Sequence, residues 1–169
     1  MTLPTAHSNL QLNRFCAVIA APFGVMGIRT HAGQLLELVY LPPDFQLKDP
    51  VTACAKKTAQ QMQCYFNNPQ YHFDLPLAEQ GTLFQKKVWQ AIAAIPMGQV
   101  ATYGQIARQI RSAPRAVGQA CGANFYPLII PCHRVTASNG LGGFANQDQA
   151  DSYPLKIKRW LLRHEGVHY

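Results

Sequence analysis

The apolar positions near the start of the chain fall into three short runs of strand length. The runs FCAVIA, VMGIRT and GQLLELVYL are rich in β-branched and aromatic side chains, and turn residues at 22–24 and 31–33 separate them. Runs of this composition between closely spaced turns are typical of neighbouring antiparallel strands. Residues 1–41 therefore predict an antiparallel meander.

The next stretch, residues 51–66, has the periodicity of a helix instead. In VTACAKKTAQQMQCYF one helical stripe collects mainly apolar or small residues: Val51, Cys54, Ala55, Thr58, Met62, Tyr65 and Phe66. Turn residues then dominate 67–81, which we interpret as a linker. The chain is thus predicted to hold an N-terminal α+β domain, residues 1–81, and a second domain, residues 82–169.

The second domain has helical periodicity. After Thr82, a suitable N-cap, apolar side chains recur at helix spacing until a break at 96–98. These side chains are Phe84, Val88, Ala91, Ile92 and Ile95. A last helix is expected over 153–163, ending before Gly166. The predicted fold class is α+β: a small N-terminal antiparallel sheet with a helix, then a mainly helical domain.

Two short helices joined by a tight turn are expected in the middle of the second domain. TYGQIARQI begins with a capping Thr102, and PRAVGQACGAN begins with Pro114, which suits the first position of a helix. Two short helices in this arrangement predict a helix-turn-helix.

The second of these helices carries small side chains after Arg115. Because Ala116, Gly118 and Gln119 hardly reach the base edges of a major groove, they would suit contact with a backbone or a minor groove, with Arg115 as the one long probe. Close helix packing inside the domain would account for the same small residues. The pattern alone leaves both interpretations open.

The positive charge is confined to the second half of the chain. The formal net charge is +7. Residues 1–81 contain five basic and five acidic side chains, whereas residues 82–169 contain ten basic and three acidic ones. This asymmetry favours a polyanionic partner for the second half, although a solvated basic surface has the same composition.

The five cysteines have no pairing rhythm, which indicates a reducing compartment rather than a disulfide framework. The chain has no CxxC pair and its six histidines are scattered, so we expect no metal. We expect a cytoplasmic protein without a membrane partner, because no signal peptide is evident and no apolar run approaches roughly 20 residues.

The segment IIPCHRV places a thiol and an imidazole next to each other, at Cys132 and His133. In an extended segment successive side chains point to opposite sides, so a direct thiol–imidazole contact is not expected. An unassisted thiol is only about 3% ionised at neutral pH, so a nucleophilic role needs a base. Either something bridges the two groups, or Cys132 is a buried structural thiol.

Five motifs of residues 82–169, in this order along the chain, together resemble the O6-alkylguanine-DNA alkyltransferase family. They are FQKKVWQAIAAIPMGQVATYGQIA, PRAVGQACGAN, IIPCHRV, GLGGF and RWLLRHEG. The resemblance implies a ribonuclease-H-like N-terminal domain. It also implies irreversible, stoichiometric transfer of an alkyl group from O6-alkylguanine, and from O4-alkylthymine, to Cys132, with no cofactor.

The resemblance also assigns roles to individual residues. Cys132, His133 and Glu165 match the family's relay, in which a water carries the proton and Glu165 orients and charges the imidazole. Arg115 matches the intercalating arginine, and Tyr103 the tyrosine that meets the 3′ phosphate while the nucleotide flips. Asn124 matches the hinge between the helix-turn-helix and the active-site segment.

The base pocket implied by the resemblance is lined by Pro127, Val135, Phe144 and Ala145. The implied partner is duplex DNA containing alkylated bases, bound by a monomer that can cluster on DNA. The stretch that starts at Ala145 departs from the family's usual second glycine pair, and the zinc ligands of some relatives have no counterparts here.

Three other functions have sequence arguments against them. A non-enzymatic binder of alkylated bases would carry Trp where this chain has Cys132. A sequence-reading transcription factor would need longer side chains after Arg115. A cysteine hydrolase would turn over many times, which a suicide acceptor does not.

Overall fold

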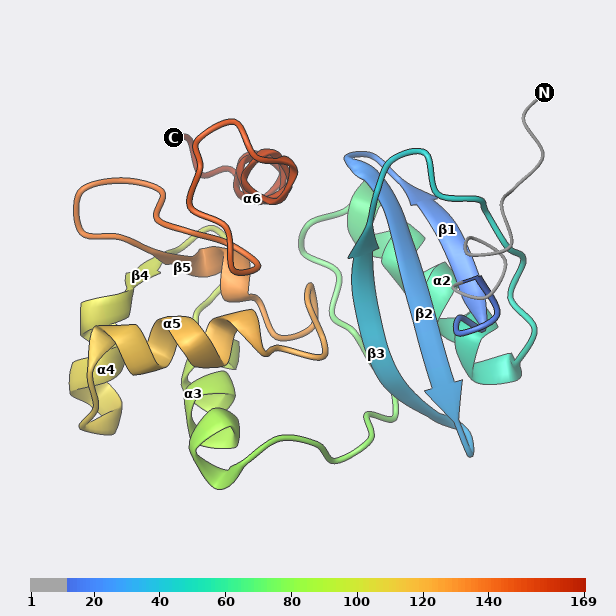
Figure 1. Cartoon of the computed structure of the whole chain (residues 1–169), viewed down its shortest axis with the longest axis horizontal. Helices are drawn as coiled ribbons and strands as arrows, with labels where there is room; N and C mark the ends of the chain where they lie inside the picture. The colour runs from blue at the N-terminus through green and yellow to red at the C-terminus, as the bar shows by residue number, and fades with distance from the viewer. Residues whose placement is uncertain (1–11) are drawn as a thin grey trace. The chain divides into compact units, whose positions relative to one another are not determined.

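The structure is a computed structural model that describes residues 12–169, and contacts within the chain divide it into two compact units between Glu79 and Gln80 (Figure 1). The first unit contains β1 (Ala17–Ala21), β2 (Gly24–His31), β3 (Gln34–Leu41) and α2 (Ala53–Asn67). The strands form one antiparallel sheet in the order β1-β2-β3, with Ala17 opposite Ile28 and Val25 opposite Leu41. The predicted meander is confirmed within the described residues.

Helix α2 packs against all three strands of this sheet (Figure 1). The hydroxyl of Thr52 accepts a hydrogen bond from the Ala55 amide at 3.0 Å and so caps the start of the helix. The buried stripe is Ala55, Thr58, Gln61, Met62, Tyr65 and Phe66. The prediction for Val51 was wrong: it precedes the helix and is exposed.

Gln61 takes a buried place in the stripe that the apolar pattern did not reveal. Its side-chain amide donates to the Asp74 carbonyl and accepts from the Asp74 amide, both at 2.8 Å. A buried polar side chain is tolerated when its donors and acceptors are paired in this way. Gln61 therefore holds the segment after α2 to the helix.

Part of the segment interpreted as a linker lies along the sheet. The Leu35 amide donates to the Pro76 carbonyl at 2.8 Å, and the Ala78 amide donates to the Leu35 carbonyl at 2.9 Å. These bonds form a parallel bridge between Leu35 and Leu77. Turn-rich composition concealed this pairing, because a bridge this short has no periodicity to detect.

The second unit has the elements α3 (Leu83–Ala93), β4 (Ala101–Thr102), α4 (Tyr103–Ile110), α5 (Pro114–Gly122), the 3-10 helix η1 (Cys132–Arg134), β5 (Val135–Thr136) and α6 (Tyr153–His164). The α+β fold class is confirmed. The parallel pair β4–β5, which places Ala101 beside Val135, was not predicted because each strand is only two residues long.

Local capping sets the starts of α3 and α4. Thr82 and Gln85 form a reciprocal capping box, and Thr102 and Gln105 form another, with hydrogen bonds of 2.7–3.1 Å. Helix α4 ends at Ile110, and its C-cap, Arg111, has a left-handed φ of 58°; Pro114 begins α5 after a short turn. The two helices pack on each other and on α3.

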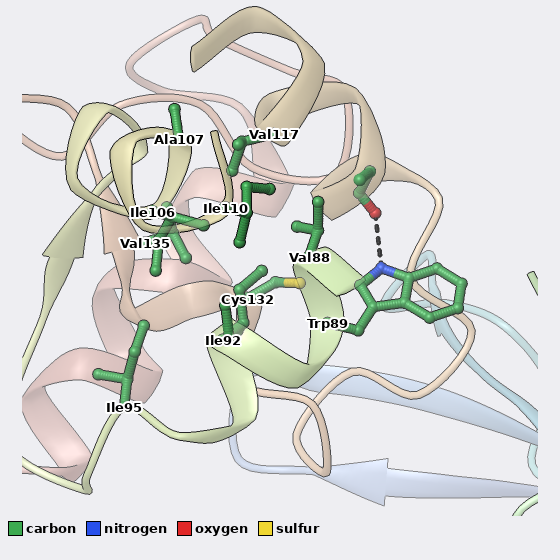
Figure 2. Packing of buried hydrophobic residues seen from close by; sticks show 12 residues of the cluster. Val88, Trp89, Ile92, Ile95, Ile106, Ala107, Ile110, Val117, Cys132 and Val135 are labelled. Carbon is green, nitrogen blue, oxygen red and sulfur yellow. Dashed lines mark hydrogen bonds between the residues drawn. The ribbon is translucent and has the colours of Figure 1, made fainter. Parts of the chain in front are cut away.

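The core of the second unit lies between α3, α4, α5 and η1 (Figure 2). Its fully buried members include Val88, Ile92, Val117 and Val135, and Cys132 belongs to the same cluster. The Trp89 indole donates to the Ala120 carbonyl at 2.8 Å and ties α3 to α5, as the dashed line in Figure 2 shows. No helix within residues 12–169 has the length and apolar character needed to span a bilayer.

We expect Ile92→Ala to lower the free energy of unfolding of the second unit by about 2–5 kcal/mol, because it removes buried volume from this core. Urea unfolding followed by tryptophan fluorescence measures this, since both tryptophans lie in that unit. Leu83→Ala is the matched control on the same helix: Leu83 is 87% exposed, whereas Ile92 is 0% exposed. Equal losses for the two variants would contradict the assigned core.

Candidate functional site

Cys132 is the first residue of η1 and is 5% exposed. The Asn124 side-chain amide donates to the Cys132 sulfur at 3.2 Å and to the Ile130 carbonyl at 2.9 Å. The Asn124 side-chain oxygen in turn accepts from the Tyr126 amide at 2.9 Å. Asn124 therefore holds the loop between α5 and η1 and also places a hydrogen-bond donor on the sulfur.

Cys132 also lines a cavity of about 760 Å³ formed by α4, α5, η1 and residues 143–148. This volume is typical of a small-molecule site. Seven of the residues predicted to act in the site line it: Tyr103, Arg115, Gly118, Gln119, Cys132, Phe144 and Ala145. Cys132 thus belongs both to the apolar core and to the cavity wall.

His133 points to a different set of partners. Its Nε2 lies 2.9 Å from Oε1 of Glu165, and both side chains are buried. The Arg134 guanidinium donates to both oxygens of Glu165 at 2.9 Å and to the Ile95 carbonyl at 2.6 Å. A bidentate arginine is a strong partner for a carboxylate. Arg134 was quoted in the motif, but its role was not predicted.

The chain at Cys132 and His133 is a 3-10 turn, so the expected extended segment was wrong. The conclusion drawn from it still holds, since a helix with 3.0 residues per turn separates neighbouring side chains by about 120°. The second ring nitrogen, Nδ1 of His133, is buried and has no hydrogen-bond partner among the described residues. It is available as a proton acceptor.

Burial is the largest influence on the His133 ring, and it lowers the pKa of His133 despite the opposing effect of Glu165. The resting imidazole is therefore neutral, which differs from the expectation that Glu165 charges it. Burial alone would raise the pKa of Glu165, but the hydrogen bonds and charges of His133 and Arg134 lower it to about 2. Glu165 stays ionised and orients a neutral ring.

The pKa of Cys132 is raised well above its ordinary value. A hydrogen bond with Cys121 is the largest cause, followed by burial and the charge of Cys121, whereas Asn124 and Lys158 act in the opposite direction. The acceptor is thus a protonated thiol in the resting protein. Cys121 was not singled out in the sequence, although it lines the same cavity.

Lys158 is a buried lysine whose role was also not predicted. Its ammonium group donates to the carbonyls of Val135, Leu141 and Gly143 at 2.7, 2.7 and 2.8 Å. Burial lowers the pKa of Lys158 to about 8, against the opposing effect of the two nearby cysteines. A signal existed in the sequence: Lys158 lies at helix spacing on the apolar stripe of α6, between Leu155 and Leu162.

Tyr103, the first residue of α4, lines the cavity. Its hydroxyl donates to the Gly143 carbonyl at 3.1 Å, and the Lys158 ammonium lies 5.8 Å from the centre of its ring. Burial, and then the charges of Cys121 and Cys132, raise the pKa of Tyr103, so its phenol remains protonated. Gly142 has a φ of +73°, and a Cβ there would lie 2.9 Å from the Ala137 amide nitrogen, so a larger residue would displace this loop.

The remaining predicted residues lie outside the cavity lining. Val135 is in the core, and its carbonyl is bonded to Lys158; Pro127 is buried, and Ala116 lies on α5. Asn124 donates to the Cys132 sulfur, and His133 and Glu165 are bonded to each other in the interior. Within residues 12–169 no group of three or more His, Cys, Asp or Glu side chains is arranged to hold a metal ion.

Residues 83–167 match a family model described as 6-O-methylguanine DNA methyltransferase, DNA binding domain. A methylated-DNA–protein-cysteine methyltransferase of Methanosarcina barkeri is 36% identical over 154 residues, which are 86% of this chain and 98% of that relative. One of Salmonella typhimurium is 52% identical over 95 residues, or 54% of this chain and 52% of the relative.

Solved structures are similar over most of the chain. The O6-methylguanine methyltransferase of Mycobacterium tuberculosis has a TM-score of 0.73 and 33% identity, covering 88% of this chain and 90% of that one. A structure of Mycobacterium tuberculosis OGT in complex with DNA has a TM-score of 0.72 and 34% identity, covering 88% and 91%.

The pKa of Glu165 predicts how stability responds to acid. Because the folded-state pKa, about 2, lies below the ordinary value of 4.5, the stabilisation is present above pH 4.5 and is lost as the pH falls towards 2. We expect wild type to lose on the order of 3 kcal/mol over this range from Glu165 alone. Urea unfolding at pH 5 and pH 2 measures it. Glu165→Gln should flatten the profile; an equally steep loss in that variant would be contradictory.

Proposed function

This chain belongs to the 6-O-methylguanine DNA methyltransferase family, and we propose from that premise that it repairs duplex DNA by accepting the alkyl group of O6-alkylguanine on Cys132. The observation that carries the proposal is that Cys132 lines a cavity together with Arg115 and Tyr103, while the next residue, His133, is buried and bonded to Glu165. O4-alkylthymine is a second lesion of the same chemical class.

The proposed DNA-binding element is the pair α4–α5, acting as a helix-turn-helix. Arg115 stands at the start of α5, and Gly118 and Gln119 follow it along the cavity wall. Small side chains on this helix allow close approach to a minor groove, and Arg115 is long enough to fill the space that a displaced base leaves in the stack. Tyr103 would press on the neighbouring 3′ phosphate while the nucleotide rotates out.

The base enters the cavity after rotation, because the alkyl carbon cannot reach a buried thiol from within the duplex. Tyr103 and residues 143–148 line the cavity, and the Lys158 ammonium lies 5.8 Å from the centre of the Tyr103 ring. Rotation costs a few kcal/mol and costs least for a lesion that already pairs badly, so it contributes to selectivity.

The transfer begins with loss of the thiol proton. We propose that an ordered water passes this proton from Cys132 to Nδ1 of His133, the ring nitrogen without a protein partner. The neutral imidazole is the form that can accept it, and the adjacent Glu165 carboxylate then stabilises the imidazolium. The Asn124 amide and the Lys158 ammonium stabilise the thiolate as it forms.

The thiolate sulfur then attacks the alkyl carbon, and the bond between that carbon and the guanine oxygen breaks. The guanine leaves with the electron pair of that bond and takes up one proton from the site. The product, S-alkylcysteine, is a thioether that this site has no group to cleave. Each molecule therefore acts once, as a monomer, and requires no cofactor; several molecules can cluster along damaged DNA.

We expect one molecule of protein to become heavier by one methyl group in place of one proton after mixing with duplex DNA containing O6-methylguanine. Mass spectrometry should place the change in the peptide that contains Cys132, and Cys132→Ser should remain unmodified. Cys64→Ser, an exposed thiol, is the matched control and should react as wild type does. Repair of more than one lesion per molecule would overturn the suicide mechanism, and unchanged protein mass would overturn the proposal.

Arg115→Ala should slow repair of duplex DNA by about 10–100-fold but hardly change the reaction with the free base O6-methylguanine, because only the duplex requires nucleotide rotation. Single-turnover rates on the two substrates measure this ratio. Arg163→Ala is the matched control, since it removes an equal charge from an exposed position of α6, outside the proposed DNA-binding helices. Equal losses on duplex and free base for Arg115→Ala would rule out intercalation.

A further inference from the structure

A second thiol shares the cavity with the proposed acceptor. Cys121 is on the last turn of α5, is partly exposed, and lines the same cavity as Cys132. It also packs against the apolar cluster to which Cys132 belongs, and the interaction of the two thiols is the largest influence on the pKa of Cys132. The mechanism proposed above has no use for Cys121.

We propose that Cys121 and Cys132 are a redox pair that forms a reversible disulfide and so removes the alkyl acceptor while oxidant is present. The pair is specific within the described residues, because Cys16, Cys54 and Cys64 belong to the other unit of the chain. The consequence of this modification rests on the proposed function of Cys132, whereas the disulfide itself does not.

The oxidant that the geometry favours is a small hydroperoxide. Cys121 is more exposed than Cys132, so it meets a solute that enters the cavity first. The Cys121 sulfur, as thiolate, attacks one oxygen of hydrogen peroxide, and the O–O bond breaks. Hydroxide leaves, and Cys121 becomes a sulfenic acid. The hydroxide takes up the proton that Cys121 had released and becomes water.

Cys132 then resolves this intermediate. Its proton passes towards His133, its sulfur attacks the Cys121 sulfur, the S–S bond forms, and the S–O bond of the sulfenic acid breaks. The departing hydroxide receives the proton and leaves as a second water. Both sulfurs are oxidised by one electron each, and one hydrogen peroxide is reduced to two waters.

The reverse reaction requires a thiol reductant. A small thiolate attacks one sulfur of the pair, and a second thiol releases the other, so the two cysteines are restored while the reductant becomes a disulfide. Without Cys121, a sulfenic acid on Cys132 has no neighbouring thiol to resolve it and can proceed to the sulfinic acid, which such thiols do not reduce. Cys121 thus protects an acceptor that can be used only once.

The experiment uses the full chain treated with hydrogen peroxide and then digested without reductant. Cleavage after Arg115 and Arg134 releases peptide 116–134, which contains both thiols. We expect this peptide to be two hydrogens lighter and to stay linked after chymotrypsin cuts between Phe125 and Tyr126. Oxygen added to either cysteine without a link, or a link only to Cys64, would overturn the proposal.

A second arm measures methyl acceptance from DNA before oxidation, after oxidation and after dithiothreitol. Wild type should lose acceptance in proportion to the linked peptide and regain it on reduction. Cys121→Ser should show no link. It should regain a smaller share of the acceptance that it loses, because the part of its Cys132 that reaches the sulfinic acid is not reduced by dithiothreitol. Cys64→Ser, the exposed control, should behave as wild type. Full recovery in Cys121→Ser would contradict the pairing.

The two proposals fail in distinguishable ways. A linked peptide in a protein that never accepts a methyl group would leave the thiol pair standing and remove the repair function. Methyl acceptance in a protein whose peptide 116–134 never links would support the repair function and overturn the thiol pair. If Cys121→Ser does not fold, as judged by tryptophan fluorescence, the peptide mass of oxidised wild type still decides whether the pair forms.

Discussion

The buried carboxylate of Glu165 is the interaction on which the geometry of the site depends. Its side chain has no exposed surface, so it is tolerated only because His133 and Arg134 supply hydrogen bonds and compensating charge. These bonds join the end of α6 to η1, and Arg134 extends the connection to the carbonyl of Ile95 after α3. The position of Cys132 is therefore set by this network, which joins α6, η1 and the segment after α3, together with the bonds of Asn124 in the loop before η1.

Local features of the sequence predicted the starts of the helices, but they did not predict hydrogen-bond partners that lie far away in the sequence. The capping roles of Thr82 and Thr102 and the place of Pro114 were correct because each depends on residues within one helical turn. The family resemblance is also confirmed. Arg134 and Lys158 could not be given partners, because the atoms they bond lie 15–39 residues away in the chain. The roles of the site residues remain predictions.

Two of the ten basic residues of 82–169, Arg134 and Lys158, have their charge compensated inside the protein. Lys158 is enclosed and Arg134 is largely so, and Glu165 is enclosed with Arg134, so these charges compensate groups inside the protein. The rest of residues 82–169 contains eight basic residues and only two acidic ones, Asp148 and Asp151. The excess of positive charge that remains thus still favours a polyanionic partner, after the charges required by the interior have been set aside.

The resting protonation states explain how a reactive thiol can be kept inert in a stable protein. The interaction with Cys121 and then burial raise the pKa of Cys132, and burial lowers the pKa of His133, so Cys132 remains a thiol and His133 a neutral ring. A proton transferred between them creates two charges at once, and each charge has a preset partner: Asn124 and Lys158 for the sulfur, Glu165 for the ring. Because these partners are already in place, ionisation needs no rearrangement of the protein. The Cys132 sulfur can react only when an electrophilic carbon is present. Alkylation of the sulfur therefore requires that a substrate occupy the cavity.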